Sequence, residues 1–451
     1  MIVAFDDTDS TEGMCTTFLA TKIIEELESY DLIGFPRLVR LNPAVPWKTR
    51  GNGAIAMRFG HGRGKKTQIG MISGSPVYSY ERGESDVKLE EVAQRCGEVL
   101  KRWARTEEGA SPGLVVTRTK PRESFYWNAV RSIVERGLVE EELKRIGAIK
   151  FELSGGRGII GATAAAAWRP KDRTYEIITY RFENKWGTER EIDESTVKSL
   201  DSTFPSTFNN YDLGQERIAI APHSPCPILF GIRGDDVNEL VPAMQSIKGE
   251  PAERWLIYLT NQGTDDHIIT DWRELTPCRS YAVKGVVLGG PTTIKGGHVV
   301  FKMLPDQYRM PIDCTAYEPS KSFRDVIRAL NPGDRIVVYG ELRDEPRTLN
   351  IEKLRVLDLV ESREKTGNPV CPSCGKRMKS IGRSAGYRCR RCGSKASEAD
   401  ADYRIVPRPI QIGWYEPPVC SRRHLSKPLK RVLQKPLRFC RSPTETQAIL
   451  K

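Results

Sequence analysis

The sequence predicts a multidomain protein of α/β and β class, with several hydrophobic cores rather than one. Its 451 residues exceed what a single core holds, and this length is typical of about three or four domains. Strand and helix patterns alternate up to Thr260, whereas short strands dominate from Tyr281 onward. Four cysteines near the C-terminus then indicate a small module held by a metal ion.

Apolar spacing places the elements of the N-terminal half. A buried strand at Met1–Phe5 precedes a helix at Gly13–Tyr30, and a second amphipathic helix covers Asp86–Arg105. Proline and glycine make residues 42–53 a loop. The remaining elements are strands at Arg37–Leu41, Ala54–Phe59, Gly113–Arg118 and Lys150–Leu153, a glycine turn at 154–161 and an alanine-rich helix ending at Trp168.

The second half predicts two further architectures. The strand, helix and strand at Pro227–Arg233, Asp236–Lys248 and Trp255–Thr260 resemble half of a ferredoxin-like α+β fold. Five short strands with a helix before the fourth are the layout of an OB-fold β-barrel. These strands are Tyr281–Leu288, His298–Met303, Asp313–Ala316, Arg335–Glu341 and Leu349–Leu359, the helix is Ser322–Leu330, and residues 361–369 are expected to form a linker.

Composition favours a soluble protein of a reducing compartment. No apolar run approaches the ~18 residues of a membrane span, and the N-terminus lacks the basic segment of a secretory signal. Of the eleven cysteines, four form one array and the others are scattered, which disfavours a disulfide framework. The expected location is the cytoplasm.

Positive charge is concentrated at the C-terminal end. The chain carries a net charge of +12, and residues 362–451 contain 21 Lys and Arg against 6 Asp and Glu. This distribution predicts a surface for a polyanion such as a nucleic acid. A solvated basic tail is the alternative, which the interleaved Trp414, Tyr415, Leu425 and Leu429 disfavour.

The cysteine array is the most specific motif. Two C-x2-C pairs lie 14 residues apart, and a glycine follows each pair. Four thiolates fill a tetrahedral Zn²⁺ site, so the predicted role is structural and the module is a zinc ribbon. Its predicted ligands are Cys371, Cys374, Cys389 and Cys392.

Two further motifs point to phosphate chemistry, each with an alternative. Asp6, Asp7 and Asp9 at the tip of the first strand suit Mg²⁺, but a polar turn that caps the next helix explains them equally well. The basic loop from Lys48 favours the first reading. The glycine turn follows a strand and opens a helix, as phosphate cradles do, but it also fits close helix packing.

The chain resembles one family, the archaeal tRNA(Ile2) 2-agmatinylcytidine synthetases (TiaS). The similarity begins with the Asp-Asp-Thr-Asp-Ser run at 6–10 and Gly-Met-Cys-Thr-Thr at 13–17. It continues in order through segments 34–43, 48–53, 222–234, 260–265, 296–298, 316–319 and 422–429, and so covers nearly the whole chain.

The resemblance implies four domains and a reaction. The domains are a kinase-like α/β domain (1–61 and 117–200), a ferredoxin-like domain (62–116 and 201–275), an OB-fold (276–360) and a zinc ribbon with basic tail (361–451). The implied enzyme is an ATP-dependent carbon–nitrogen ligase that phosphorylates the C2 carbonyl oxygen of the wobble cytidine in tRNA(Ile2) with a CAU anticodon. Agmatine then displaces the phosphate.

The resemblance also implies roles for single residues. Asp6, Asp7 and Asp9 would serve Mg²⁺ and phosphoryl transfer, and Thr16 matches the position that becomes phosphorylated, with Thr17 left open. ATP phosphates would contact Lys48, Arg50, Gly51, Gly155, Gly156, Arg157 and Gly158; agmatine would contact Asp201, Asn209 and Asp212; and tRNA would contact Lys284, Lys295, His298, Arg422, Arg423 and His424.

Two other classes of function remain as alternatives. A single-strand-binding protein explains the barrel and the four cysteines, but not the acidic strand tip or the Lys48 loop. A nucleotide-dependent nuclease or phosphatase explains the acidic tip but predicts strand cleavage or phosphate release without an amine.

Overall fold

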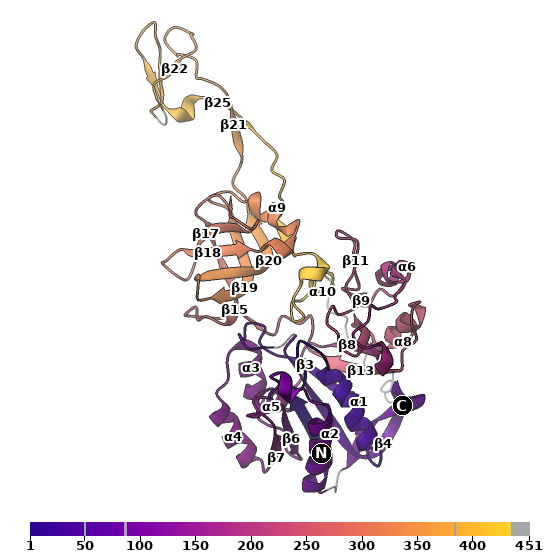
Figure 1. The fold of residues 1–451 in the computed structure, drawn as a ribbon. Coiled ribbons are helices and arrows are strands. Elements are labelled where there is room, and N and C mark those ends of the chain that lie inside the picture. Colours follow the sequence, from indigo (N-terminus) through magenta and orange to yellow (C-terminus); the bar gives the residue numbers. More distant parts are fainter. Residues whose placement is uncertain (49–50, 85–87, 383–384, 434–451) are drawn as a thin grey trace, which may run out of the picture.

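The computed structural model describes residues 1–48, 51–84, 88–382 and 385–433. Figure 1 shows a layered α/β core, a β-barrel that lies against it, and a small ribbon at the end of a thin arm. The predicted multidomain α/β and β class is confirmed. Arg50 and Asp86 lie outside the described residues, as does the tail after Leu433.

One large sheet runs through the core. Its main path is β7-β6-β1-β4-β3-β13-β8-β12-β9, and β2 and β5 pair beside it with the long strand β4. The strands are β1 (Ile2–Asp6), β2 (Asp31–Ile33), β3 (Arg37–Arg40), β4 (Gly53–Ile72), β5 (Ser75–Glu84), β6 (Gly113–Thr117), β7 (Ile149–Glu152), β8 (Thr174–Tyr180), β9 (Thr207–Phe208), β12 (Ile228–Gly234) and β13 (Arg254–Thr260).

Helices cover both faces of this sheet. In β1, Val3 and Phe5 pack with α1 and α2, whereas Ile2 and Ala4 pack with α3, α4 and α5, as the alternation of a strand requires. Burial on both faces explains why Met1–Phe5 reads as a continuous apolar run. The helices are α1 (Thr16–Glu26), α2 (Leu89–Trp103), α3 (Ser124–Arg131), α4 (Arg136–Arg145) and α5 (Ile159–Ala167).

The far end of the sheet contains the predicted strand–helix–strand unit. Helix α8 (Val237–Ser246) joins β12 to β13, and β8 lies between these two strands, antiparallel to both. The predicted strand Ala54–Phe59 is the first part of β4. No element was predicted for β8, or for the rest of the β4–β5 hairpin, whose central residues are glycine and charged groups without apolar alternation. Smaller elements complete this end: α6 (Glu194–Lys198), α7 (Leu200–Thr203), β10 (Tyr211–Asp212) and β11 (Arg217–Ile218).

The five predicted short strands form a closed barrel. Strands β15, β19, β20, β18 and β17 pair in turn, and β17 returns to β15 to close the barrel. Helix α9 (Phe323–Arg328) precedes the fourth strand in the chain, as expected. The strands are β15 (Arg279–Val287), β17 (Val299–Pro305), β18 (Ile312–Ala316), β19 (Arg335–Arg343) and β20 (Thr348–Asp358), with β14 (Ile268–Ile269), β16 (Thr292–Thr293) and β26 (Gly413–Tyr415) at the edges.

The arm corrects one expectation. Residues 361–369 were expected to be a linker, but β21 (Arg363–Gly367) pairs antiparallel with β25 (Asp402–Ile405). The exposed side chains of this segment gave no apolar alternation to detect. The arm carries the ribbon, which contains β22 (Lys379–Ser380), β23 (Tyr387–Arg388) and β24 (Lys395–Ala396) (Figure 1).

After the ribbon the chain returns to the core. We call residues 413–433 the C-terminal strap: β26 pairs with β20, and the segment ends in α10 (Leu429–Leu433). Gly263 and Asp265 donate backbone hydrogen bonds to the carbonyl oxygens of His424 and Leu425, at 2.8 and 2.9 Å. Arg431 forms an ion pair of 2.9 Å with Asp235. The described part of the basic tail is therefore docked and not a solvated extension.

A buried charge cluster joins the barrel, the strap and the core. Glu352 on β20 accepts a hydrogen bond from His267 at 2.9 Å and lies 3.3 Å from Nε of Arg423. Burial raises the pKa of Glu352, but Arg423, His267 and Lys353 outweigh this effect and hold the pKa at about 2. Since its ordinary pKa is 4.5, ionised Glu352 stabilises the folded state above that pH, and this contribution is lost as the pH falls toward 2.

Replacing Glu352 by glutamine should therefore destabilise the protein in a pH-dependent way. At pH 7 we expect the free energy of unfolding to fall by about 3 kcal/mol, because the charge of Arg423 loses a buried partner. The difference from the wild type should shrink as the pH is lowered below 4.5. Urea unfolding across this pH range measures it, and a difference that does not change with pH would contradict the assignment.

Candidate active site

A single cleft brings together half of the predicted site residues. Its volume is about 570 Å³, and it is lined by the tip of β1, the start of α1, the loop after β3, the start of α5, residues 217–228 and the strap. The C-terminal strap thus lines the same cleft as the N-terminal strand. The predicted residues that line the cleft are Asp6, Asp7, Asp9, Thr16, Lys48, Gly51, Arg157, Gly158, Asn209, Arg422, Arg423 and His424.

The acidic pole of the cleft contains Asp6, Asp7 and Asp9, and the carboxyl group of Asp6 resists ionisation. Burial raises the pKa of Asp6 to about 8, and the neighbouring charges of Asp7 and Asp9 add to this effect. Asp7 has a positive φ of 58°, a conformation that side-chain-bearing residues adopt rarely. Carboxylate oxygens are the ligands that Mg²⁺ prefers, but among the described residues only the four ribbon cysteines bring three or more ligand atoms together as a metal site does.

The glycine turn holds the acidic pole in place. Nε and Nη2 of Arg157 donate to Oδ2 of Asp7, at 2.9 and 2.7 Å. Gly158 and Gly161 leave room for Asp6, because a Cβ atom at either position would overlap with its backbone or carboxylate. Close packing of strand and helix therefore explains these glycines, while Gly155 and Gly156 do not line the cleft.

Gly161 offers a direct test of this packing. Replacing it by alanine would drive a methyl group into the Asp6 carboxylate, and we expect the free energy of unfolding to fall by about 1 to 3 kcal/mol. Gly137 in α4 is a matched control, because it is exposed and a Cβ there meets no atom within 4 Å. Gly137→Ala should keep or raise stability in the same urea titration, and equal effects of the two variants would contradict the packing argument.

The start of α1 faces the cleft. Its N-cap residue Cys15 makes no side-chain capping bond, so the first backbone N–H groups of the helix are available to an anion. Thr16 and Thr17 both line the cleft and are buried. Oγ1 of Thr16 accepts from Oγ1 of Thr8 at 3.2 Å, while Oγ1 of Thr17 lies 3.1 Å from Sγ of Cys15. The geometry thus keeps both hydroxyls beside the acidic pole.

Basic residues also line the cleft. Burial lowers the pKa of Lys48, and Arg423 lowers it further. The positive charge of Arg40 holds the pKa of His424 well below its usual range, so this imidazole is neutral at physiological pH. An anion entering this side of the cleft would meet positive charge, which suits a phosphate.

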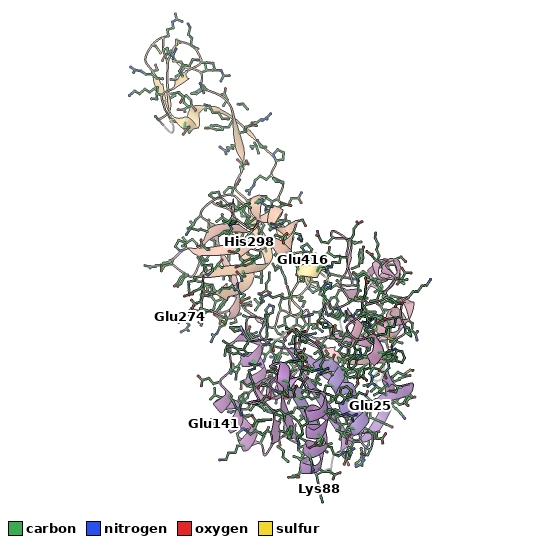
Figure 2. All side chains as sticks on the ribbon, in the orientation of Figure 1. Glu25, Lys88, Glu141, Glu274, His298 and Glu416 are labelled. Carbon is green, nitrogen blue, oxygen red and sulfur yellow. The ribbon has the colours of Figure 1, made fainter. Side chains whose placement is uncertain are left out.

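The strap arginines are paired with protein groups in this structure. Nη2 of Arg422 lies 2.8 Å from Glu416, and Nη1 donates to Oδ1 of Asn209 at 2.7 Å. Arg423 forms ion pairs with Glu341 and Glu352. Figure 2 labels Glu416 where the barrel, the strap and the core meet. These guanidinium groups therefore shape the cleft wall.

The residues expected to contact agmatine form a small acidic neighbourhood beside the cleft. Asp201 accepts from Nδ2 of Asn210 at 2.6 Å, and Asp212 accepts from the backbone N–H of Cys420 at 3.1 Å. Both carboxylates act electrostatically on Arg422. Asn209 lines the cleft, whereas Asp201 and Asp212 lie behind its wall.

Three predicted tRNA contacts lie on the barrel, outside the cleft. Lys284 and Lys295 are exposed, and Lys284 lies 3.8 Å from Asp306. His298, labelled in Figure 2, accepts a hydrogen bond from the backbone N–H of Glu318 at 2.9 Å. The cleft does not include them.

Sequence reasoning missed several cleft residues. Arg40, Glu176 and Arg233 line the cleft but were not assigned a role. Arg40 ends a strand and Glu176 lies within one, where a charged residue alone gives no signal of a site. Both Arg40 and Arg233 fall in segments that carry the family resemblance, which was the one available clue.

The four predicted zinc ligands converge at the far end of the arm. Their ligand atoms all lie within 4.8 Å of one another. The Sγ atoms of Cys371 and Cys392 are 3.4 Å apart, as are those of Cys374 and Cys389. Four sulfurs bound to one Zn²⁺ at about 2.3 Å lie about 3.8 Å apart, so the array fits a structural zinc site.

In the part of the chain that the structure describes, no helix is both long enough and apolar enough to span a bilayer.

Family models match most of the chain. They are the TiaS TCKD domain at residues 2–155, the TiaS FLD domain at 156–267 and the TiaS C-terminal zinc ribbon domain at 368–410. A curated relative, the tRNA(Ile2) 2-agmatinylcytidine synthetase TiaS of Methanocaldococcus jannaschii, is 39% identical over 445 residues, covering 96% of this chain and 99% of the relative.

Solved structures agree with these matches. A TiaS–tRNA(Ile2)–AMPCPP–agmatine complex is 35% identical with a TM-score of 0.79, covering 95% of this chain and 96% of that one. A ZRD-deleted mutant of TiaS in complex with agmatine is 30% identical with a TM-score of 0.71, at 95% and 96% coverage. The chain therefore belongs to the family of tRNA(Ile2) 2-agmatinylcytidine synthetases, TiaS.

Proposed function

We propose that the chain is an ATP-dependent ligase that converts the wobble cytidine of tRNA(Ile2), in its CAU anticodon, to 2-agmatinylcytidine. One observation carries the proposal: a single cleft joins an acidic strand tip, the start of a helix and an arginine-rich strap. The relatives support it, because one is named for this reaction and a solved TiaS complex contains tRNA(Ile2), AMPCPP and agmatine.

The reaction needs an activated carbonyl oxygen. The C2 oxygen of cytidine attacks a phosphorus atom of ATP, so a C2–O–P linkage forms and a P–O bond of ATP breaks. The primary amine of agmatine then adds at C2, loses a proton, and expels phosphate. A phosphate is a far better leaving group than oxide, so charge neutralisation and alignment do most of the catalytic work.

Residue roles follow from the position of each group. Asp6, Asp7 and Asp9 would hold Mg²⁺, which supplies charge neutralisation at the phosphates when bound. Lys48, Gly51, Arg157 and Gly158 line the cleft and would contact phosphates, and Thr16 or Thr17 would accept a phosphate. Arg50 would contact phosphates as well, whereas Gly155 and Gly156 would support the turn that carries Arg157. Asp201, Asn209 and Asp212 would attract the positively charged agmatine, and Lys284, Lys295, His298, Arg422, Arg423 and His424 would contact tRNA.

The domain names belong to the same proposal. We assign a kinase-like domain to residues 1–61 and 117–200 and a ferredoxin-like domain to 62–116 and 201–275. The arrangement of β8 between β12 and β13 with α8 supports the second name. The closed barrel at 276–360 is assigned as an OB-fold and 361–451 as the zinc ribbon with its tail.

Mass spectrometry of tRNA(Ile2) incubated with the protein, ATP, Mg²⁺ and labelled agmatine tests the proposal. We expect the label in the wobble nucleoside only when all components are present. ATP consumption that is unaffected by tRNA and agmatine would overturn the proposal. Strand cleavage without incorporation of the amine would instead favour a nuclease.

A further inference from the structure

One guanidinium group in the cleft has no carboxylate partner among the described residues. Arg40 ends β3, its Nε is buried, and this Nε has no hydrogen-bond partner. The contact that its side chain makes with a described residue is a long hydrogen bond of 3.4 Å from Nη1 to the carbonyl oxygen of Gly51. Burial lowers the pKa of Arg40, and the more distant charges of Glu176 and Asp9 offset this effect only in part.

Other cleft arginines differ from Arg40 in this respect. Four other arginines of the cleft each form an ion pair with a carboxylate. These pairs are Arg157 with Asp7, Arg233 with Glu176, Arg422 with Glu416, and Arg423 with Glu341 and Glu352. Arg217 also lines the cleft, but it is exposed, where water solvates its charge.

The surroundings of Arg40 leave space for an anion. A Cβ atom on Gly51 would lie 2.6 Å from Nη1 of Arg40 and 3.2 Å from Nε2 of His424, so glycine keeps this corner open. The imidazole of His424 is neutral, so the positive charge in this corner of the cleft belongs to Arg40 and not to the histidine. The start of α1, with its free N–H groups, lines the same cleft.

A buried amide fixes the position of Arg40. Oδ1 of Asn261 accepts from the backbone N–H of Arg40 at 2.7 Å, and its Nδ2 donates to the carbonyl oxygen of Arg40 at 2.9 Å. The same Nδ2 donates to the hydroxyl of Tyr126, which donates to Asp266 at 2.5 Å. Asn261 is fully buried, so this network holds the strand end rigidly.

We propose that Arg40 binds a phosphate group of the substrates, either of the ATP triphosphate or of the tRNA backbone at the reacting nucleotide, and that Asn261 is its positioning residue. The inference rests on the proposed function, because that function supplies both phosphates. A phosphate matches the planar fork of a guanidinium and offsets the burial of its charge.

Affinity measurements on the full-length protein test the assignment. Binding of AMPCPP is measured by calorimetry and binding of a tRNA(Ile2) transcript by gel shift, for the wild type, Arg40→Ala, Arg40→Lys and Asn261→Ala. We expect Arg40→Ala to weaken one or both affinities by about tenfold to a hundredfold, as loss of a charge-assisted hydrogen bond does. The ligand whose affinity falls identifies the source of the phosphate.

Arg37→Ala is the matched control, because Arg37 lies on the same strand but donates to the carbonyl oxygen of Trp168 and does not line the cleft. Its affinities should match those of the wild type. Asn261→Ala should weaken the same ligand as Arg40→Ala, and the double variant should lose little more, because the two act as one unit. Arg40→Lys keeps the positive charge and should retain part of the affinity. If Arg40→Ala fails to fold, the lysine variant still tests the assignment.

Affinities of Arg40→Ala within twofold of the wild type for both ligands would overturn the inference, as would equal losses in Arg37→Ala. A wild-type protein that binds neither ligand would instead refute the proposed function.

Discussion

Replacing Asp7 by asparagine should abolish incorporation of agmatine into tRNA(Ile2) while leaving tRNA binding intact. The substitution removes one charge from the acidic pole and breaks the ion pair that joins Asp7 to Arg157. Both groups line the side of the cleft where we place the transferred phosphate. Loss of one preorganised electrostatic group costs about a hundredfold to a thousandfold in turnover, and this is the reduction we expect.

Single-turnover incorporation of labelled agmatine measures this effect, and a gel shift measures tRNA affinity. Asp271→Asn is a suitable control, because Asp271 is exposed and lies outside the cleft. It should behave like the wild type in both assays. If Asp7→Asn kept more than half of the wild-type rate, the acidic pole would have no catalytic role, and a protein that only binds nucleic acid would become the better description.

The chemistry of both chain ends could be predicted from local patterns. The strand that ends in carboxylates and the cysteine array are each complete within about twenty residues of sequence. The barrel strands can be recognised from the alternation of apolar and polar residues. The structure confirms that the four cysteines converge and that the predicted short strands form a closed barrel. These features depend on residues that are close together in the chain, so they can be recognised in a single sequence.

The joint position of the two ends could not be predicted. Arg423 reaches Glu352 and Glu341 on the barrel, and His424 meets Gly263 in the core, through contacts between residues far apart in the chain. Nothing in the sequence of the strap distinguishes an arginine that pairs with a carboxylate from one that faces RNA. Arg40 could not be identified from the sequence for the same reason. Its proposed role rests on the absence, among the described residues, of a carboxylate within ion-pairing distance.

The ribbon and the strap should have separable functions, although they adjoin in sequence. The arm allows the ribbon to be deleted without the strap, because Gly367 on β21 lies opposite Asp402 on β25. Replacing residues 368–401 by an Asn-Gly turn would close the arm as a hairpin and leave the strap unchanged. We expect this variant to bind AMPCPP and agmatine like the wild type, since neither the ribbon nor the arm lines the cleft.

Its tRNA affinity should fall by about a hundredfold or more at moderate salt, because the deleted segment carries much of the basic charge. A chain that ends at residue 412 should lose the binding of all three ligands. That truncation removes Arg422, Arg423 and His424 from the cleft wall and leaves Asp235 and Glu352 without their strap partners. Calorimetry and gel shifts compare the two variants with the wild type. Equal loss of AMPCPP binding in both would mean that the ribbon, and not the strap, completes the cleft.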